Sequence, residues 1–333
     1  MSALYCIIKK YEIRYIAQQV IKMHDHELVK ESLRISPDRP FSWSYFRLNL
    51  FNKCQRAYFF HYYGAQNGWD PYADSRSQHI HKLKNLKLVD QWLEDVFIKS
   101  LRKLFIAPRP KRSSPTMPQV FKNIIIKYID TENREYTAHE CDDDHRKLNL
   151  FESYYGQVTD HFSIRAYAKK KLFAAVDQLA GCAIFNELCA VKYFQWKSFS
   201  PPIYAYIDRK QVWAAPALIW SDAGIYNVLN LRLTEPVDDF PISLGISAIY
   251  LAQRLRVSYD KIHCRKIFLH HTTDIYSGHC PIDDLHALIE TSSSEMRARM
   301  TDDGCAVESE FPKCNDIQKC ATCNFKELCF TNT

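Results

Sequence analysis

Apolar residues in the first 40 positions recur at roughly the spacing of a helix. Charged residues such as Lys9, Lys10 and Glu12 interrupt them, and a stretch with two prolines closes the segment at residues 36–40. An apolar stripe of this period is typical of an amphipathic helix, and closely spaced prolines end helices. We therefore predict a helical N-terminal extension over residues 1–40, formed by one amphipathic helix or by a helix with a preceding strand. We expect it to pack on the protein's own core, and a docking surface for a partner is the alternative.

The rest of the chain alternates between helical and strand patterns. Helical periodicity covers 83–104, 160–186 and 243–255, and β-rich runs cover 203–207, 211–220, 225–233 and 266–271. Polar turns at 208–210 and 221–224 separate consecutive runs, as in β-hairpins. This order predicts an α/β domain over residues 41–333, with a mixed central sheet flanked by helices.

Glycine is scarce, with 8 residues in a chain of 333. No spacing among the glycines fits the phosphate loops of dinucleotide- or nucleoside-triphosphate-binding enzymes, or the nucleophile elbow of α/β-hydrolases. These three classes are excluded, and we expect no nucleotide cofactor.

Cysteine is frequent, with 12 residues, although the chain is long enough to bury a core without disulfides. No apolar run approaches the ~18 residues of a membrane span, and the N-terminal region lacks the pattern of a signal peptide. We expect a cytoplasmic protein with no membrane contact, in which clustered cysteines bind metal. The net charge of +6 permits a nucleic-acid partner without arguing for one.

Three cysteines near the C-terminus, Cys320, Cys323 and Cys329, have the spacing of metal ligands. The first two can reach one centre from a tight turn, and the third returns after about one and a half helical turns. Two residues can supply a fourth ligand. Cys314 is local and would complete a zinc-ribbon-like site, whereas Cys54 lies more than 260 residues earlier.

The surroundings of Cys54 carry a family resemblance. The chain reads Phe-Ser-Trp-Ser-Tyr from residue 41 and Cys-Gln-Arg-Ala-Tyr-Phe-Phe-His-Tyr-Tyr-Gly from residue 54, and its C-terminal region contains Cys-x₂-Cys-Asn-Phe-x₂-Leu-Cys. Together these motifs resemble the iron–sulfur branch of the PD-(D/E)XK nuclease superfamily, which includes RecB-like exonucleases, AddB-type subunits and CRISPR-adaptation exonucleases. The resemblance spans about residues 41–330 and implies a restriction-endonuclease-like core.

The resemblance also implies a cofactor. A four-iron, four-sulfur cluster would be bound by Cys54, Cys320, Cys323 and Cys329, with Cys314 spare and zinc as the alternative metal. The C-terminal part of this centre covers about residues 312–330. Metal bonds that close so long a loop remove unfolded-state entropy, so the cluster is expected to act chiefly as a structural link between the two ends of the domain.

The catalytic positions of the family are substituted. Relatives place His on an early helix, Asp on one strand and (D/E)-x-Lys on the next, and here the corresponding residues are Phe97, Ala217, Asn230 and Arg232. Phenylalanine and alanine cannot bind Mg²⁺ or Mn²⁺, and arginine stays protonated. We therefore expect the catalytic metal site to be absent. The alternative is a displaced site that uses Asp208 and Lys210, with Glu187 as a second acid.

These observations favour a catalytically inactive RecB-like homologue that acts as a DNA-binding or scaffolding subunit in a DNA-processing or defence complex. Lys99, Arg102, Lys103 and Arg232 are candidate phosphate contacts. The alternatives are an active Mg²⁺- or Mn²⁺-dependent DNA nuclease with displaced ligands and a protein–protein interaction module that binds no nucleic acid.

Overall fold

The computed structural model describes residues 33–330 except 39, 107–115, 143, 145, 158–160, 198, 200–201, 234–239, 271–272 and 279–281. The predicted helical extension therefore lies, up to residue 32, outside the described residues. The chain forms two compact units. Unit 1 combines the described residues of Met1–Asp38, Cys54–Lys84 and Ala298–Thr333, and unit 2 combines those of Arg39–Lys53 and Asn85–Arg297.

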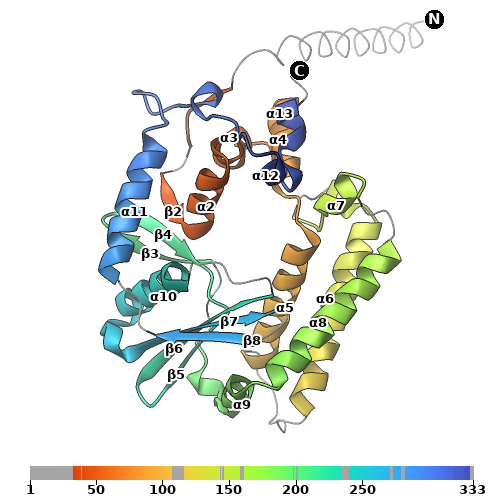
Figure 1. Cartoon of the computed structure of the whole chain (residues 1–333), viewed down its shortest axis with the longest axis vertical. Helices are drawn as coiled ribbons and strands as arrows, with labels where there is room; N and C mark the ends of the chain where they lie inside the picture. Colours follow the sequence, from red (N-terminus) through yellow and green to blue (C-terminus); the bar gives the residue numbers. More distant parts are fainter. Residues whose placement is uncertain are drawn as a thin grey trace, which may run out of the picture. The chain divides into compact units, whose positions relative to one another are not determined.

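A four-stranded mixed sheet lies at the centre of unit 2 (Figure 1). Its strands, in spatial order, are β5 (Leu218–Asp222), β6 (Ile225–Arg232), β7 (Ile262–Leu269) and β8 (Thr273–Gly278). β5 and β6 form an antiparallel hairpin, helix α10 (Phe240–Leu255) leads to β7, which is parallel to β6, and β8 is antiparallel to β7. This arrangement confirms the predicted mixed sheet.

Helices cover both faces of this sheet. One face packs on a layer whose main helices are α5 (Val89–Phe105), α6 (Met117–Thr137), α8 (His161–Ala180) and α9 (Ala183–Ala190). Residues of α10 pack on the other face, where they form one hydrophobic cluster with Val228 of β6 and Ile219 of β5. The central strands are therefore buried on both sides, which explains their nearly continuous apolar sequence.

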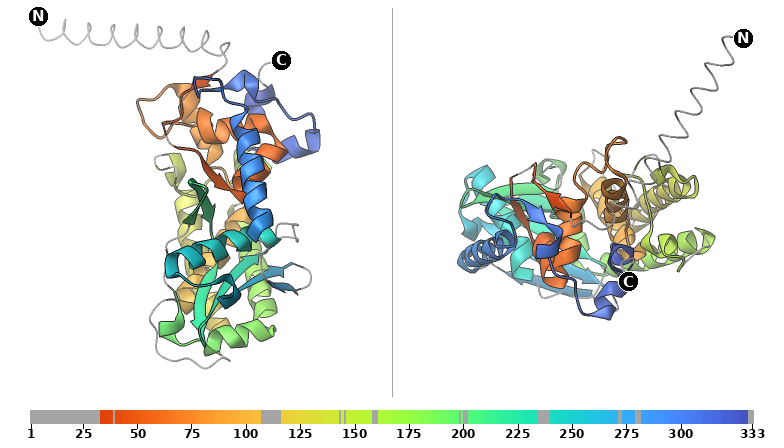
Figure 2. Two further views of the ribbon diagram at one scale, coloured as in Figure 1. Left: turned by 90° about the vertical axis from the view of Figure 1, so that its left-hand side faces the viewer. Right: turned by 90° about the horizontal axis from the view of Figure 1, so that it is seen from above.

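A second sheet in unit 2 has three strands. The spatial order is β2 (Ser42–Ser44), β4 (Lys210–Ala214) and β3 (Ile203–Ile207), with β2 parallel and β3 antiparallel to β4. Helix α2 (Tyr45–Lys53) follows β2 directly, and α11 (Ile282–Arg297) contacts this region through Ser292, whose Oγ accepts a hydrogen bond from Trp43 Nε1 at 2.9 Å. α10 and α11 lie side by side (Figures 1 and 2).

Several predicted boundaries were wrong. The run 211–220 is not one strand, because it breaks around Pro216 into β4 and β5, which belong to different sheets. Proline has no N–H for a ladder bond, so a central strand does not pass through it. The predicted helix 83–104 is the end of α4 (Ser75–Lys84) followed by α5, and the helix 160–186 breaks after Ala180 at Gly181.

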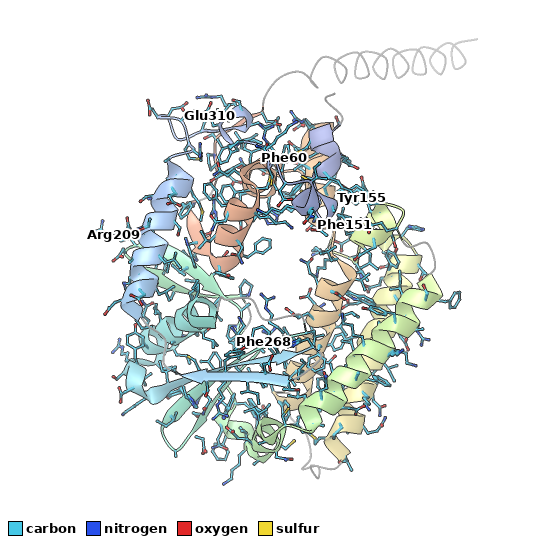
Figure 3. The ribbon with its side chains drawn as sticks, viewed as in Figure 1. Phe60, Phe151, Tyr155, Arg209, Phe268 and Glu310 are labelled. Atoms are coloured by element: carbon cyan, nitrogen blue, oxygen red, sulfur yellow. The ribbon has the colours of Figure 1, made fainter. Side chains whose placement is uncertain are left out.

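Unit 1 joins segments that are far apart in sequence. β1 (Arg34–Ile35) pairs antiparallel with β9 (Ala306–Val307), and four helical segments complete the unit together with α4: α3 (Gln55–Phe59), the π-helix Phe60–Gly64, α12 (Ile317–Ala321) and α13 (Lys326–Phe330). Phe311 packs against Tyr58, Phe59 and Tyr63, and Phe60, labelled in Figure 3, packs against Phe325 with ring centroids 5.6 Å apart.

A buried carboxylate connects these segments. Glu308 is 5% exposed and accepts hydrogen bonds from Arg56 Nη1 at 2.9 Å and from Arg76 Nη2 at 2.8 Å. Its backbone N–H donates to the carbonyl of Leu33. The charge is thus paired on both oxygens, which is the condition for burying a carboxylate without a large desolvation cost.

Candidate functional site

Five cysteines meet around one small cavity in unit 1. The cavity has a volume of about 70 Å³, and its lining includes Cys54, Cys314, Cys320, Cys323 and Cys329. The structure therefore brings Cys54 to the C-terminal cysteines, as the resemblance implies, and it places Cys314 beside them. None of the ten described cysteines forms a disulfide.

Local backbone geometry presents each thiol to the cavity. Cys54 is the N-cap of α3, and its Sγ accepts a hydrogen bond from the Ala57 amide at 3.4 Å. Cys320 lies on α12, a short helix that begins after the N-cap Asp316, and Cys329 lies on α13. Cys314 Sγ accepts from the Asp316 amide at 3.3 Å. N–H···S contacts of this kind stabilise thiolate charge.

Basic and apolar side chains complete the cavity. Lys313 and Lys326 line it together with Ala57 and Phe325. Burial raises the pKa of the Cys329 thiol, and the nearby Cys54 raises it further, whereas Lys313 and Arg56 lower it. The Cys329 thiol therefore holds its proton more tightly than an exposed cysteine, unless a cation compensates the charge.

The volume of the cavity bears on the kind of group that it could hold. A zinc ion draws its thiolates to about 2.3 Å from the metal. Among the described residues no group of three or more Cys, His, Asp or Glu side chains is placed to hold a metal ion. An iron–sulfur cluster carries inorganic sulfur between its irons and needs the thiolates around a larger volume. The cavity is several times larger than the about 10–15 Å³ that admits one water.

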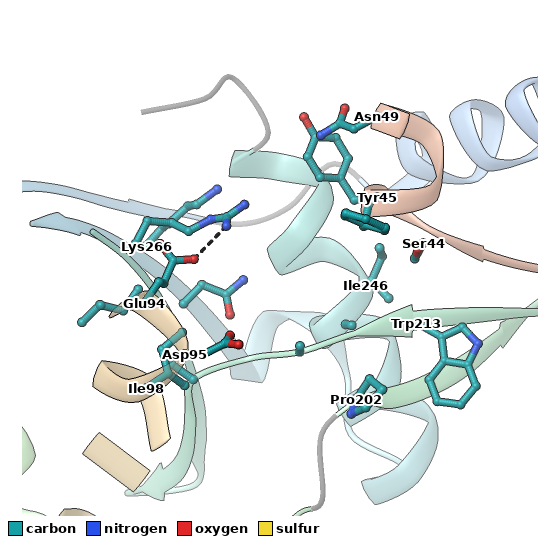
Figure 4. Close-up of a pocket in the computed structure, with 17 residues that line it drawn as sticks. Ser44, Tyr45, Asn49, Glu94, Asp95, Ile98, Pro202, Trp213, Ile246 and Lys266 are labelled. Atoms are coloured by element: carbon teal, nitrogen blue, oxygen red, sulfur yellow. Dashed lines mark hydrogen bonds and ion pairs between the residues drawn. The ribbon is translucent and has the colours of Figure 1, made fainter. Parts of the chain in front are cut away.

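A second, larger cavity lies in unit 2 at the end of β6, with a volume of about 500 Å³ (Figure 4). Three of the four substituted catalytic positions line it, namely Ala217, Asn230 and Arg232. Asn230 Oδ1 is buried and has no hydrogen-bond partner among the described residues. The hairpin thus brings together the positions that were matched on sequence alone.

Phe97 does not line this cavity. Its ring is fully buried and packs against Phe121 of α6 with centroids 4.9 Å apart. Leu93 and Leu101, one helical turn away on either side, are buried in the same core. Phe97 therefore belongs to the interface between α5 and its neighbouring helices, and the residues of α5 that face the cavity are Glu94, Asp95 and Ile98.

Three charged residues of this cavity were missed in the sequence. Glu94 Oε1 accepts from Arg232 Nη1 at 2.8 Å, and Glu94 Oε2 accepts from the Leu233 amide at 3.0 Å. Asp95 accepts from Lys87 Nζ at 2.5 Å. Lys266, labelled in Figure 4, is 1% exposed and pairs in register with Asn230 across β6 and β7. A lysine directly before the apolar run Ile267–Leu269 was the available signal for a buried cation.

The four candidate phosphate contacts lie in different surroundings. Arg102 donates to the carbonyl oxygens of Ala217 at 3.0 Å and Pro216 at 2.5 Å, and burial lowers its pKa, so it supports the break between β4 and β5. Lys99 pairs with Glu132 at 2.9 Å, and Lys103 is exposed. Arg232 is the candidate that lines the cavity.

Asp208 and Lys210, which the sequence offers as an alternative catalytic metal site, lie in and directly after a tight turn. Asp208 and Arg209 have φ values of 47° and 63°, which is the left-handed pair of a two-residue hairpin turn. Lys210 pairs with Glu290, and Glu187 pairs with Arg265. None of Asp208, Lys210 and Glu187 lines the cavity.

Comparison with known proteins does not assign the chain to a family. The chain matches none of the protein-family models and none of the curated proteins with which it was compared.

Among the described residues no single helix is long and apolar enough to cross a membrane. The bent pair Phe162–Ala180 and Ala183–Ala190 meets the length and composition criteria only when its two helices are taken together.

Proposed function

We propose that this protein is a nuclease-like subunit of the PD-(D/E)XK type that binds DNA without cleaving it and carries a four-iron, four-sulfur cluster. The observation that carries this proposal is that both carboxylate oxygens of Glu94 are already hydrogen-bonded, one to Arg232 and one to the Leu233 amide. Two carboxylates line the large cavity, and Glu94 is the more buried of the two.

This arrangement leaves too few oxygen ligands for a catalytic cation. Mg²⁺ binds in proteins through carboxylates and water at near-octahedral geometry. Ala217 offers only its backbone, Asn230 only a neutral amide, and Asp95 is paired with Lys87. The side chains at the substituted positions therefore support binding of a phosphate backbone more than hydrolysis of it.

The cysteine cavity supports the second part of the proposal. When bound, the cluster would link α3 to the C-terminal segment, with Cys54, Cys320, Cys323 and Cys329 as the ligands and Lys313 and Lys326 next to its negative charge. Protein purified without oxygen is expected to be brown, with visible absorption and about four irons per chain. A colourless protein with one bound zinc would contradict this part of the proposal.

The test of function combines binding and cleavage. Pure protein is mixed with end-labelled single- and double-stranded DNA in Mg²⁺ or Mn²⁺. We expect retarded complexes that weaken steeply with added salt, because phosphate neutralisation releases counterions, and we expect full-length DNA after incubation. Absence of salt-dependent binding would instead favour a protein–protein interaction module.

An active nuclease is the second candidate, because two carboxylates and a buried lysine share the large cavity. Asp95 would then be a metal ligand. Cleavage that is lost in Asp95→Asn, and kept in the exposed control Asp222→Asn on β5, would establish that the protein is an active nuclease and overturn the proposal.

A further inference from the structure

The outer face of the three-stranded sheet carries a row of aromatic side chains. Residues of β3 alternate strictly, so that Ile203, Ala205 and Ile207 are buried while Tyr204 and Tyr206 are 44% and 56% exposed. On β4, Trp213 lies opposite Tyr204 in the register and is half-buried. Large apolar rings on the solvent side of a strand leave area available for a ligand.

The ring of Tyr204 lies against both of the other rings. Tyr204 and Trp213 have centroids 5.2 Å apart, and Tyr204 and Tyr206 have centroids 5.7 Å apart. We call these three residues the aromatic row. The strand beneath is held from the side, because Gln253 Oε1 accepts from the Tyr206 amide at 3.1 Å and Gln253 Nε2 donates to the Tyr206 carbonyl at 2.7 Å. Because both peptide groups of Tyr206 are taken, an added β-strand cannot pair at this residue.

The aromatic row continues into the large cavity. Trp213 lines that cavity, and Figure 4 shows it on the side away from Glu94 and Lys266. Phe46 of α2, which is 55% exposed, lines the same cavity. Arginines lie at both ends of the path: the exposed Arg209 in the turn after β3, and Arg232 inside the cavity, whose side chain is 42% exposed and pairs with Glu94.

We propose that the aromatic row is a stacking platform for single-stranded nucleic acid, whose bases lie on Tyr206, Tyr204 and Trp213 and whose chain runs on into the large cavity. This inference rests on the proposed function and adds where the nucleic-acid strand would lie on the protein. Every base has a face that stacks on an aromatic ring, so the platform tolerates any sequence, and the arginines at both ends suit the phosphates.

Geometry favours a single strand over a duplex. Side chains two residues apart on one strand lie about 6.7 Å from each other, whereas bases stacked in duplex DNA are about 3.4 Å apart. Paired bases also stack on each other and hide their faces. An unpaired strand can spread its bases and place one on each ring, as sheet-based readers of single-stranded RNA do.

The experiment measures the affinity of the full-length protein for a fluorescent 15-residue oligothymidylate by anisotropy at several salt concentrations. Tyr204→Ala and Tyr206→Ala should each weaken binding by about 5- to 150-fold, the range that loss of one base–aromatic stack produces. Tyr204→Phe and Tyr206→Phe keep the rings and should bind like the wild type. The slope of log affinity against log salt should stay unchanged in all four, because no phosphate contact is removed.

Tyr276→Ala is the matched control, because Tyr276 is also a strand tyrosine and is 41% exposed, on β8 in the other sheet. It should leave the affinity unchanged. Wild-type-like binding by both alanine variants of the aromatic row would overturn the inference while leaving the proposed function intact. Failure of the wild type to bind any DNA would remove the proposed function itself, and this inference with it. A folded wild type that binds a peptide through the row, and no oligothymidylate, would likewise overturn the inference.

Discussion

Phe97 illustrates how much of the stability of unit 2 rests on single core side chains. Its ring is fully buried against Phe121, so Phe97→Ala removes the contacts and leaves a cavity. We expect the free energy of unfolding to fall by about 3–5 kcal/mol. Denaturant unfolding measures this loss. Phe162→Ala is the control, since Phe162 is 84% exposed, and it should stay within about 0.5 kcal/mol of the wild type. Equal losses in the two variants would contradict the core position of Phe97.

Asp303 gives unit 1 a pH dependence. Hydrogen bonds from Thr301 and then from Arg34 lower its pKa from 3.8 to about 2. These bonds favour the carboxylate only in the folded chain, so the stabilisation is present above the unfolded pKa and is lost as the pH falls through the folded one. The advantage of the wild type over Asp303→Asn in unfolding free energy should thus be constant above about pH 5 and shrink toward pH 2. An advantage that persists unchanged at pH 2 would contradict this assignment.

At this scale, the sequence indicates groups of residues whose spacing along the chain is local. Cys320, Cys323 and Cys329 stand out by such a spacing, and they line one cavity, while their role as metal ligands stays a prediction. Glu94 does not stand out in the sequence, because its role depends on Arg232, a residue 138 positions later in the chain that meets it only after the hairpin forms. Lys266 was missed for the same reason, since its burial is decided by the neighbouring strands.

At the scale of elements, the close approach of two backbone segments restricts which residue can stand at position 68. Gly68 follows the π-helix and lies against α4, where a Cβ atom would come within 2.1 Å of the Ser77 carbonyl oxygen and 2.6 Å of His81 Cβ. Gly68→Ala must push the loop away from α4, and we expect a loss of about 1–3 kcal/mol in the free energy of unfolding. Gly278→Ala has no atom within 4 Å of its new Cβ and should cost nothing by this mechanism. Thermal unfolding of both variants tests the difference.

Hairpins were the most predictable elements. The turn at 221–224 was readable from its polar residues, and Ala223 and Gly224 adopt φ values of 45° and 80° there. The break at Pro216 was visible in the sequence, but which sheet each half joins was not. That choice depends on β2 and β6, which pair with β4 and β5 from distant parts of the chain.

At the scale of the whole molecule, the proposed cluster connects parts of unit 1 that no continuous segment joins. Cys54→Ser should abolish visible absorption and lower the free energy of unfolding by several kcal/mol, because closing a loop of this length is worth on the order of 5 kcal/mol. Cys314→Ser should keep the absorption and the bound iron. Iron analysis and the visible spectrum measure both outcomes. Loss of the cluster in Cys314→Ser and its retention in Cys54→Ser would assign the local, zinc-ribbon-like ligand set instead.

The division into two units was not predictable from local patterns. Residues 54–84 form one compact unit with residues 298–333, which lie far away in the sequence. The unit is held together by contacts between aromatic rings that are distant in sequence, such as Tyr58 and Phe311. The hydrophobic periodicity of the chain does not indicate such contacts.

The discontinuity of unit 1 has a consequence for biosynthesis. A ribosome that adds about 5–20 residues per second needs on the order of 15–50 s to travel from Cys54 to Cys320. During that time the Cys54 thiol has been made and the three C-terminal cysteines have not. Insertion of the proposed cluster would therefore wait for the last part of translation, and until then the nascent chain would offer the Cys54 thiol to oxidants and to competing metals.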